Sequence, residues 1–361
     1  MNFGLVRRGY SATGGAEAYL KRFARALATA GHSSTLFTSA DWPREDWPGD
    51  RIERLAGGDS PLAFANALQT ARAGAGCDYL FSLERVLDCD AYRAGDGVHR
   101  AWLERRARFE PFWKRWGRVF NPKHRELLAL EQRLFAAQQA GTIIANCKMV
   151  KEEIVQIYGY PAERIHVVYN GLPAFTPSPE LREATRAQLG IAPSTPVVLF
   201  AGSGWERKGL AAAVEGIRLV KSAMPPLLLI AGRGNTRRYQ GGERVRFLGP
   251  VRQMAACYAA ADLFVLPTFY DPFSNACLEA LAAGLPVITT RANGFSEIVQ
   301  PGINSEVLED PSDAAGIARA IEAWSDPQRR AAIRPELLEL AGRFTMEANV
   351  RNTLAAMGVG A

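Results

Sequence analysis

Short runs of β-forming residues alternate with helical patterns along almost the whole chain, and this alternation limits the fold more than any other feature. Strands that alternate with helices form parallel sheets, because each helix carries the chain back to the start of the next strand. The sequence therefore predicts an α/β fold. The expected strands span residues 3–6, 34–38, 79–83, 142–145 and 166–169 in the first half, and 197–201, 227–231, 245–248, 263–267 and 287–290 in the second.

The chain is long enough for two domains. At 361 residues it exceeds the length that one hydrophobic core usually supports. The stretch 171–179 has three prolines in nine residues and no periodicity, which is typical of a semi-rigid linker. We predict domains at 1–172 and 173–345, with a final helical stretch, 346–361, that returns to the first domain. Open α/β sheets bind ligands at the carboxyl ends of their strands, so two facing halves would form a cleft there.

The cysteines and the hydropathy pattern indicate a cytoplasmic protein. No stretch approaches the ~18 apolar residues of a membrane span, and the first residues lack the order of a signal peptide. The cysteines are odd in number, are widely scattered and form no C-x-x-C pair. We expect reduced, mostly buried thiols and no metal site. These cysteines are Cys77, Cys89, Cys147, Cys257 and Cys277.

The most specific pattern lies within residues 266–290. Asp271 stands in a predicted loop before a helix, and Glu279 lies a little more than one turn inside that helix. The free N–H groups of a first helical turn, together with the helix dipole, form a site for phosphates. Glu279 can accept two hydrogen bonds from a ribose, and Asp271 can accept bonds from sugar hydroxyls. The residues at the expected helix start are Phe273, Ser274 and Asn275.

This pattern resembles the donor-site signature of glycosyltransferase family four. The match consists of an acidic residue, seven others, and then Glu-Ala-x-Ala-x-Gly-x-Pro-Val-Ile from Glu279 onward. The resemblance implies the GT-B fold, two Rossmann-like doubly wound domains that face each other across a cleft, and sugar transfer with retention of configuration. In that family the first acidic position is typically Glu and contacts the transferred sugar, while the second Glu holds the ribose. Here Asp271 takes the first position and is one methylene shorter.

A second block, 200–209, ends the first strand of the second domain. It resembles the glycine loop of the same family, which carries two cations that bind the donor diphosphate. The departing nucleoside diphosphate gains negative charge as the glycosidic bond breaks, and fixed guanidinium and ammonium groups stabilise that charge without a metal. We expect Arg207 and Lys208 to act in this way, beside Gly202.

The first domain offers weaker candidates for the site. Gly14 and Gly15 resemble the N-terminal glycine pair of the family, where the backbone approaches the donor phosphates; glycine permits that approach because it has no Cβ. Residues 90–98 look like the matching loop of the lipopolysaccharide-core glucosyltransferase I subgroup, in which the aspartate at the place of Asp96 is an active-site residue. We prefer Asp96 to His99, because a hydrogen-bond acceptor is needed where the acceptor hydroxyl gives up its proton.

Two other motifs point to alternative functions that we disfavour. The glycine pairs at 202–204 and 232–234 start like a dinucleotide fingerprint, but Arg207 and Arg237 stand where the third glycine belongs, which disfavours a dehydrogenase. The triplet Asp88-Cys89-Asp90 resembles the Asp-x-Asp metal motif of the other large glycosyltransferase fold. Nothing around it supports a metal site, so we predict a loop there and no cofactor.

The net charge of +6 comes from one segment. Residues 100–125 contain nine Arg and Lys against two Glu, so this window alone carries +7. Aromatic residues are interleaved with the cations, a pattern that suits an anionic membrane surface and that the same subgroup also has at this place. Two alternatives are aromatics that cap the domain core and a single-stranded nucleic acid partner, the latter disfavoured because no nucleic-acid module is present. The residues expected to face the membrane are Trp102, Arg105, Arg106, Trp113, Lys114, Arg115 and Trp116.

Together, the resemblance implies a retaining glycosyltransferase on the cytoplasmic face of the inner membrane. The expected donor is a nucleoside diphosphate hexose, UDP-linked glucose first, and the expected acceptor is a lipid-borne glycan such as lipopolysaccharide core. The same fold also serves sugar-nucleotide epimerases. A membrane protein that binds the donor without turnover is the third possibility.

Overall fold

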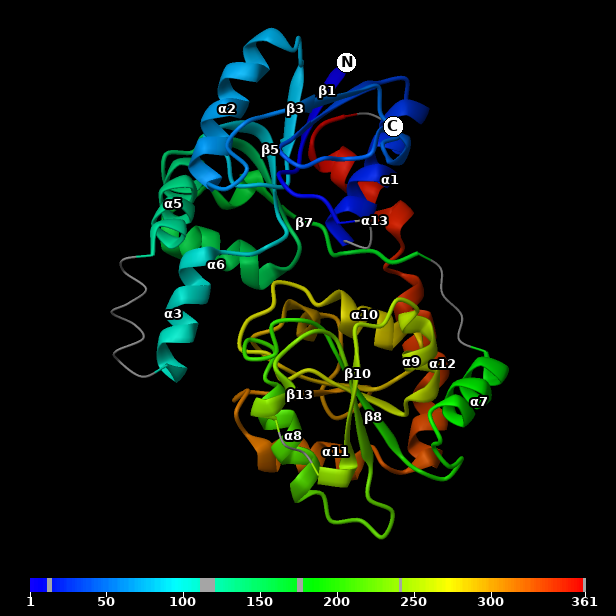
Figure 1. Cartoon of the computed structure of the whole chain (residues 1–361). Coiled ribbons are helices and arrows are strands. Elements are labelled where there is room, and N and C mark those ends of the chain that lie inside the picture. The colour runs from blue at the N-terminus through cyan, green and yellow to red at the C-terminus, as the bar shows by residue number, and fades with distance from the viewer. Residues whose placement is uncertain (12–14, 111–120, 174–177, 240–241, 360–361) are drawn as a thin grey trace. The chain divides into compact units, whose positions relative to one another are not determined.

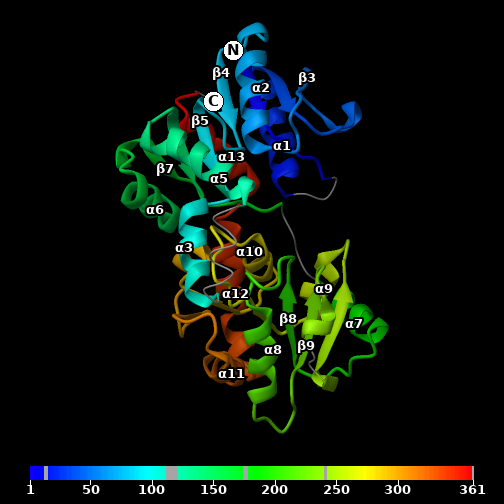
Figure 2. The same ribbon diagram turned by 60° about the vertical axis from the view of Figure 1, so that its left-hand side comes forward.

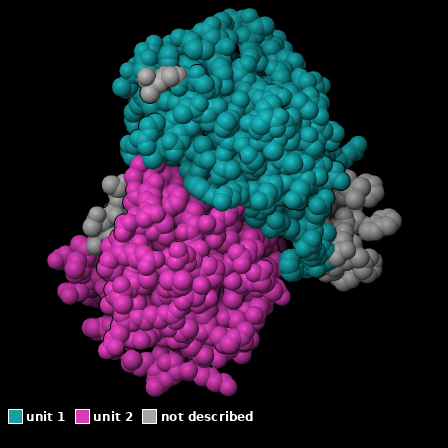
Figure 3. All heavy atoms as spheres, turned by 180° about the vertical axis from the view of Figure 1, so that it is seen from behind, with its two compact units in different colours: residues 1–169, 346–361 teal, residues 170–345 magenta. Residues whose placement is uncertain are grey.

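The computed structural model describes residues 1–11, 15–110, 121–173, 178–239 and 242–359. The chain divides into two compact units, which Figure 3 shows in different colours. Unit 1 comprises residues 1–169 and 346–361, and unit 2 comprises residues 170–345. The chain thus leaves unit 1 at Tyr169 and returns to it at Met346.

Within the described residues, unit 1 is built on a parallel sheet of seven strands in the order β3-β2-β1-β4-β5-β6-β7. The order reverses direction after β1, which is the hallmark of a doubly wound sheet. The strands are β1 (Asn2–Val6), β2 (Ser33–Thr38), β3 (Arg51–Arg54), β4 (Tyr79–Ser82), β5 (Cys89–Ala94), β6 (Ala140–Ala145) and β7 (Ile165–Val167).

Helices cover both faces of this sheet. In Figure 1, α1 and α13 lie on one side of the strands and α2, α5 and α6 on the other. The apolar positions of α1 recur at three- and four-residue steps, and Leu20, Phe23 and Leu27 are fully buried. The helices are α1 (Gly15–Thr29), α2 (Pro61–Gly74), α3 (His99–Phe109), α5 (Pro122–Glu131), α6 (Lys148–Tyr158) and α13 (Met346–Ala356).

Helix α13 completes the core of unit 1, although it is the last helix of the chain. Val350 and Leu354 belong to the same buried cluster as Phe3 and Phe23. Asn349 is also buried, and its Nδ2 donates to the carbonyl oxygen of Tyr169 at 2.5 Å. Apolar and polar contacts therefore both fix α13 against this unit.

The described residues of unit 2 form a second parallel sheet, of six strands, in the order β10-β9-β8-β11-β12-β13. Every residue of β8 and β9 is buried, since helices pack on both faces, as Figure 2 shows for β8 between α8 and α9. The elements are α7 (Pro179–Gln188), β8 (Val197–Ala201), α8 (Leu210–Leu219), β9 (Leu227–Ala231), β10 (Val245–Gly249), α9 (Met254–Ala260), β11 (Leu263–Val265), α10 (Asn275–Ala282), β12 (Val287–Thr290), β13 (Glu306–Leu308), α11 (Ala314–Ala323) and α12 (Pro327–Gly342).

The predicted strands are confirmed with shifts of at most two residues at their ends, and the described residues contain three further strands that were missed. β3 and β13 are edge strands with charged residues, so they lack the apolar run that marks a central strand. β5 is central, but Asp90 and Arg93 interrupt its apolar pattern. The prediction of a loop at Asp88-Cys89-Asp90 was therefore wrong for Cys89 and Asp90, which begin β5, whereas Asp88 precedes the strand. Arg72 bonds both carboxylates, at 2.7 Å to Asp88 and 2.8 Å to Asp90, which allows the strand to form.

The cysteines agree with the prediction of unpaired, mostly buried thiols. All five are free; four are buried, and Cys77 is partly exposed. Across the described ranges, no helix combines the length and the apolar character needed to cross a membrane.

Candidate active site

The loop that follows β8 contains three glycines with positive φ, Gly202, Gly204 and Gly209. Gly202 has φ of +142° and Gly209 has φ of +75°, values that glycine adopts more easily than other residues. A Cβ at Gly209 would lie 2.0 Å from the carbonyl oxygen of Pro267, so glycine is required for the close approach of the two loops. A Cβ at Gly202 would lie 2.7 Å from Cδ of Lys208. The side chain of Lys208 therefore lies directly on the glycine backbone.

Lys208 and Asp271 form an ion pair between the loops that follow β8 and β11. The Nζ atom lies 3.1 Å from Oδ2 of Asp271, and the two side chains are only 13% and 10% exposed. Arg207 lies beside this pair, and its Nη1 donates to the carbonyl oxygen of Tyr270 at 3.4 Å. Both loops follow strands at the carboxyl edge of the sheet, where doubly wound folds bind ligands. The structure thus brings together Gly202, Arg207, Lys208 and Asp271.

The start of α10 lies directly after this loop, as the sequence predicted. Ser274 is the N-cap, and its hydroxyl accepts from the N–H of Cys277 at 3.4 Å. Its own N–H donates to Oδ1 of Asn293 at 3.2 Å. In the first turn of α10, the N–H groups of Asn275 and Ala276 have no hydrogen-bond acceptor among the described residues. These two groups, rather than that of Ser274, are available to a phosphate.

Glu279 lies one turn into α10 and is held by a tyrosine of α9. The hydroxyl of Tyr258 donates to Oε2 of Glu279 at 2.8 Å. Burial raises the pKa of the Glu279 carboxyl, while the Tyr258 hydrogen bond and the charge of Lys208 oppose this rise. Its other oxygen, Oε1, accepts no hydrogen bond from the described residues and can accept one from a ligand.

The side chain of Phe273, at the predicted start of the helix, points into the interior of unit 2. Its side chain is 4% exposed, and its ring packs against Phe295 with the centroids 6.2 Å apart. It therefore shapes the loop from the inside. Asn275, in contrast, is exposed, and its Oδ1 accepts from Nδ2 of Asn170 at 2.8 Å.

In unit 1, charged residues follow three neighbouring strands at their carboxyl ends. Arg7 follows β1 and pairs with Glu84, which follows β4, at 3.0 Å, and with Glu17 of α1 at 3.2 Å. Asp96 follows β5 and is exposed. Burial opposes the charge of Arg7, but Glu84, Glu17 and Asp96 together raise its pKa. The sequence had indicated Asp96 but not the other three residues.

A buried carboxylate holds the turn that carries Asp96. Glu131, the last residue of α5, is fully buried, and its oxygens accept from Nε of Arg85 at 2.8 Å and from the hydroxyl of Tyr158 at 2.8 Å. They also accept from the N–H groups of His99 and Arg100, at 2.5 and 3.2 Å, and so cap the start of α3. Arg85 Nη2 in turn donates to the carbonyl oxygen of Gly97 at 2.8 Å. The turn between β5 and α3 is thereby fixed at its α3 end.

His99, the alternative to Asp96, is partly buried beside a second histidine. Its Nε2 lies 3.0 Å from Nδ1 of His124. Burial, with the charge of Arg85, lowers the pKa of His99 to about 4, so the imidazole is neutral at pH 7. Its backbone N–H is bound to Glu131, which ties this residue to the structure of the turn.

Of the predicted membrane-facing residues, three lie in α3 and the others fall outside the described residues. Trp102 is half-buried. Arg105 pairs with the largely buried Glu153 of α6 at 2.6 Å, and Arg106 pairs with Glu110. Both cations therefore have carboxylate partners within unit 1. The residues outside the described ranges are Trp113, Lys114, Arg115 and Trp116; Gly14 is also outside them, whereas Gly15 is the exposed first residue of α1.

Sequence reasoning missed the residues that fix the loops of unit 2. Asn293 is fully buried, and its amide bonds Ser274 and Thr289, which holds the loop before α10. Trp205 is 4% exposed and donates from Nε1 to the carbonyl oxygen of Gly202 at 2.9 Å. An isolated Asn or Trp in a loop carries no spacing signal. Tyr258 gave no signal either, because its partner Glu279 is 21 residues away.

Comparisons with known proteins identify the family. A family model described as "Glycosyl transferase 4-like domain" matches residues 14–171, and one described as "Glycosyl transferases group 1" matches residues 195–326. A probable transglycosylase of Burkholderia thailandensis is 30% identical over 346 residues, which cover 93% of this chain and 90% of that protein. The chain belongs to the glycosyltransferases. An uncharacterized glycosyltransferase of Methanocaldococcus jannaschii is 28% identical, and the match spans 58% of its length.

Solved structures of glycosyltransferases share the fold over the whole chain. WaaG, a glycosyltransferase involved in lipopolysaccharide biosynthesis, matches with a TM-score of 0.83 at 19% identity, and the match covers 99% of this chain and 100% of WaaG. HepE of Anabaena, in complex with UDP and glucose, matches with a TM-score of 0.75 at 20% identity and 99% coverage of each chain. This glycosyltransferase therefore has the GT-B fold, with two doubly wound α/β domains.

Proposed function

We propose that the protein transfers a hexose, glucose, from a UDP-linked donor to a lipid-borne glycan such as lipopolysaccharide core, with retention of configuration. The observation that carries this proposal is the buried Lys208–Asp271 ion pair at the carboxyl edge of the unit 2 sheet. Glu279, held by Tyr258, and the free N–H groups at the start of α10 complement it. Support for the donor and the pathway comes from the folds of HepE, solved with UDP-glucose, and of WaaG.

Each of these groups has a role in the proposed reaction. Lys208 and Arg207 stabilise the negative charge that develops on the departing diphosphate, and the first turn of α10 adds its dipole. The free oxygen of Glu279 accepts a ribose hydroxyl. Asp271 accepts a hydroxyl of the transferred sugar. Asp96, in unit 1, accepts the proton of the acceptor hydroxyl.

The activity is tested on the purified full chain. A screen of nucleotide sugars by thermal stabilisation should select UDP-glucose, and lipopolysaccharide core that lacks its outer hexoses should then release UDP and gain one hexose. Nuclear magnetic resonance of the product reports the anomeric configuration. An isomerised nucleotide sugar without any acceptor would instead identify an epimerase. Binding without hydrolysis or transfer would identify a non-catalytic protein.

The reaction should not need a divalent metal. Arg207, Lys208 and the helix start already supply positive potential where the diphosphate binds. We expect the transfer rate in 5 mM EDTA to stay within about twofold of the rate with added Mg²⁺ or Mn²⁺. Loss of activity in EDTA that manganese restores would contradict this prediction.

The pH dependence of donor binding should report Glu279. The charged carboxylate is the better acceptor for the ribose, and burial raises its pKa, so UDP affinity should be constant at high pH and fall as the pH drops through that raised value. Tyr258→Phe removes the hydrogen bond that favours the charged form, so the fall should move to higher pH. Calorimetric titrations with UDP between pH 5 and 8 measure this change in affinity. Tyr160→Phe, in unit 1, serves as the control and should leave the profile unchanged.

We further propose that residues 100–125 attach the protein to the cytoplasmic face of the inner membrane. Arg108 is exposed, and it forms no ion pair with a carboxylate of the described residues. Arg105 suits this role less well than the sequence suggested, because it is bound to Glu153. The net charge of +7 over the segment attracts anionic lipid, and aromatic rings settle at the lipid boundary.

Vesicle binding tests the attachment. The protein should sediment with vesicles that contain phosphatidylglycerol and should not sediment with neutral vesicles. Binding should weaken in high salt, since charges are already screened within ~8 Å at physiological ionic strength. Reversing Arg106, Arg108, Lys114 and Arg115 to Glu changes the segment from +7 to −1 and should abolish binding. The matched control reverses four exposed arginines of unit 2. These are Arg233, Arg237, Arg238 and Arg252. Equal binding by the two variants would refute the assignment.

A further inference from the structure

A pocket of about 280 Å³ lies at the amino-terminal edge of the unit 2 sheet. Its walls come from the start of α7, the end of α9, the turn before β12 and helix α12. Asp262 directly precedes β11, and Leu285 lies just before β12. Lys208 and Asp271, in contrast, follow strands at the carboxyl edge. The pocket therefore lies at the opposite edge of the sheet from Lys208 and Asp271, and it shares one wall residue with the candidate active site, Tyr258, which binds Glu279.

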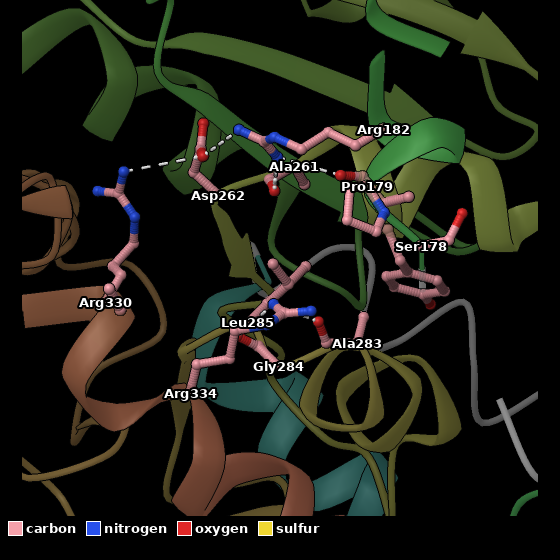
Figure 4. A pocket seen from close by; sticks show the side chains of 13 residues that line it. Ser178, Pro179, Arg182, Ala261, Asp262, Ala283, Gly284, Leu285, Arg330 and Arg334 are labelled. Carbon is pink, nitrogen blue, oxygen red and sulfur yellow. Dashed lines mark hydrogen bonds and ion pairs between the residues drawn. The ribbon is translucent and has the colours of Figure 1, made fainter. Parts of the chain in front are cut away.

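Three arginines line this pocket (Figure 4): Arg182 from α7, and Arg330 and Arg334 from α12. Among the described residues that line it, Asp262 is the single carboxylate. It is already shared, because its oxygens lie 2.7 Å from Arg182, 3.5 Å from Arg186 and 3.7 Å from Arg330. The lining thus carries three positive charges against one negative charge.

The existing contacts leave guanidinium donors unused. Arg334 donates from Nη1 to the carbonyl oxygens of Ala283 and Gly284, at 2.9 and 3.4 Å, and its Nε and Nη2 have no acceptor among the described residues. Arg330 donates from Nη1 to the carbonyl oxygen of Trp324 at 2.7 Å, and its Nη2 is beyond hydrogen-bond distance of Asp262. Each guanidinium therefore retains N–H groups for a ligand.

The electrostatic environment favours an anion. Burial lowers the pKa of Arg330 and of Arg334, and the charge of Arg182 lowers both further, while Asp262 and Asp326 oppose the shift at Arg330. A bound anion would relieve this repulsion. Ser178, the N-cap of the ten-residue helix α7, and Pro179 also line the pocket, so the positive end of that helix dipole lies at its wall. Planar guanidinium groups match the oxygens of phosphate with paired hydrogen bonds.

We propose that this pocket binds a phosphate group, supplied either by inorganic phosphate or by a small phosphomonoester. Its volume lies near the lower limit of small-molecule sites, about 300–1,000 Å³, which suits a ligand of this size. Leu285 and Ala331 provide apolar wall next to the charged groups, where the carbon skeleton of a phosphomonoester would lie. This proposal does not rest on the transfer reaction proposed above.

Calorimetry on the full chain tests the site with two probes, inorganic phosphate and glycerol 3-phosphate. The background is Arg207→Gln/Lys208→Gln, which removes the cations of the candidate active site. One phosphate per chain should bind in this background, and adding Arg330→Gln/Arg334→Gln should weaken binding at least tenfold, because charged hydrogen bonds are lost. The matched control is Arg319→Gln/Arg343→Gln, whose side chains are 71% and 68% exposed. Tighter binding of glycerol 3-phosphate would identify a phosphomonoester ligand, and equal binding would identify free phosphate.

A second measurement needs no substitution and so does not depend on the folding of the variants. Phenylglyoxal modifies accessible arginines, and mass spectrometry gives the rate at each position. Phosphate should slow modification of Arg330 and Arg334 and leave Arg319 unchanged. Unaltered phosphate affinity in the folded Arg330→Gln/Arg334→Gln variant, or equal modification rates with and without phosphate, would overturn the proposal.

Discussion

Replacing Lys208 by alanine is expected to weaken UDP binding or turnover roughly 10- to 100-fold. The loss of one charged hydrogen-bond partner costs about 1.5–3 kcal/mol, and each 1.4 kcal/mol is a factor of ten. The structure adds a second reason. Without the ammonium group, the carboxylate of Asp271, which now lies 3.1 Å from Nζ, would face the donor diphosphate unpaired and repel it. Glu279→Ala should cost at least tenfold as well, since it removes the ribose contact.

Calorimetry with UDP and steady-state kinetics with UDP-glucose measure these effects separately. Lys221→Ala provides the matched control, because this lysine is exposed and lies after α8 in the same unit. Circular dichroism and the thermal midpoint establish that each variant is folded. Wild-type kinetics in the folded Lys208→Ala variant would refute the assignment of the active site to the surroundings of Lys208.

The second large effect is expected from Glu131→Gln, which should lower the free energy of unfolding of unit 1 by about 3–5 kcal/mol. Gln has no charge, so Arg85 would remain buried without a counter-ion, and the N–H groups of His99 and Arg100 would lose a charged acceptor. Urea unfolding monitors the stability. Hydrogen exchange at the first turn of α3 reports the cap directly and should become faster.

Two further variants separate charge from packing. Glu152→Gln, on the exposed face of α6, should change the stability by less than about 0.5 kcal/mol. Replacing both partners, by Arg85→Met and Glu131→Leu, should cost less than Glu131→Gln alone, because no uncompensated charge is left behind. A double variant as unstable as the sum of its parts would show that the two residues act independently, and would refute the ion-pair argument.

The sequence predicted the fold class well because central parallel strands are buried on both faces. β8 and β9 are short apolar runs and β12 is the β-branched run Val-Ile-Thr-Thr; all three were placed correctly to the residue. β3 could not be recognised, since its residues are Arg-Ile-Glu-Arg and an edge strand needs only one apolar contact face. β5 was missed because its polar residues are satisfied by partners distant in sequence, such as Arg72 for Asp90.

In the candidate active site, too, the residues that lie close together in sequence were predicted, and those held by distant contacts were not. Residues close together in sequence, such as Arg207 with Lys208 and Asp271 with Glu279, carry a spacing that a pattern can match. Residues that hold them in place are defined only by three-dimensional contact. Asn293 reaches the loop before α10 through its amide, and Glu131 reaches α3 from the end of another helix. No local pattern indicates such contacts.

The position of α13 in unit 1 has a consequence for biosynthesis. The ribosome delivers the strands of unit 1 first, yet Val350 and Leu354, which belong to its core, emerge only after all of unit 2. Domains usually fold in the order in which they are synthesised, but this order cannot be completed here. Unit 2 is continuous in sequence and can complete its folding first. Until α13 is synthesised, the apolar face of unit 1 that this helix covers stays exposed. During that interval, we expect chaperones that shield apolar surface to bind the nascent chain.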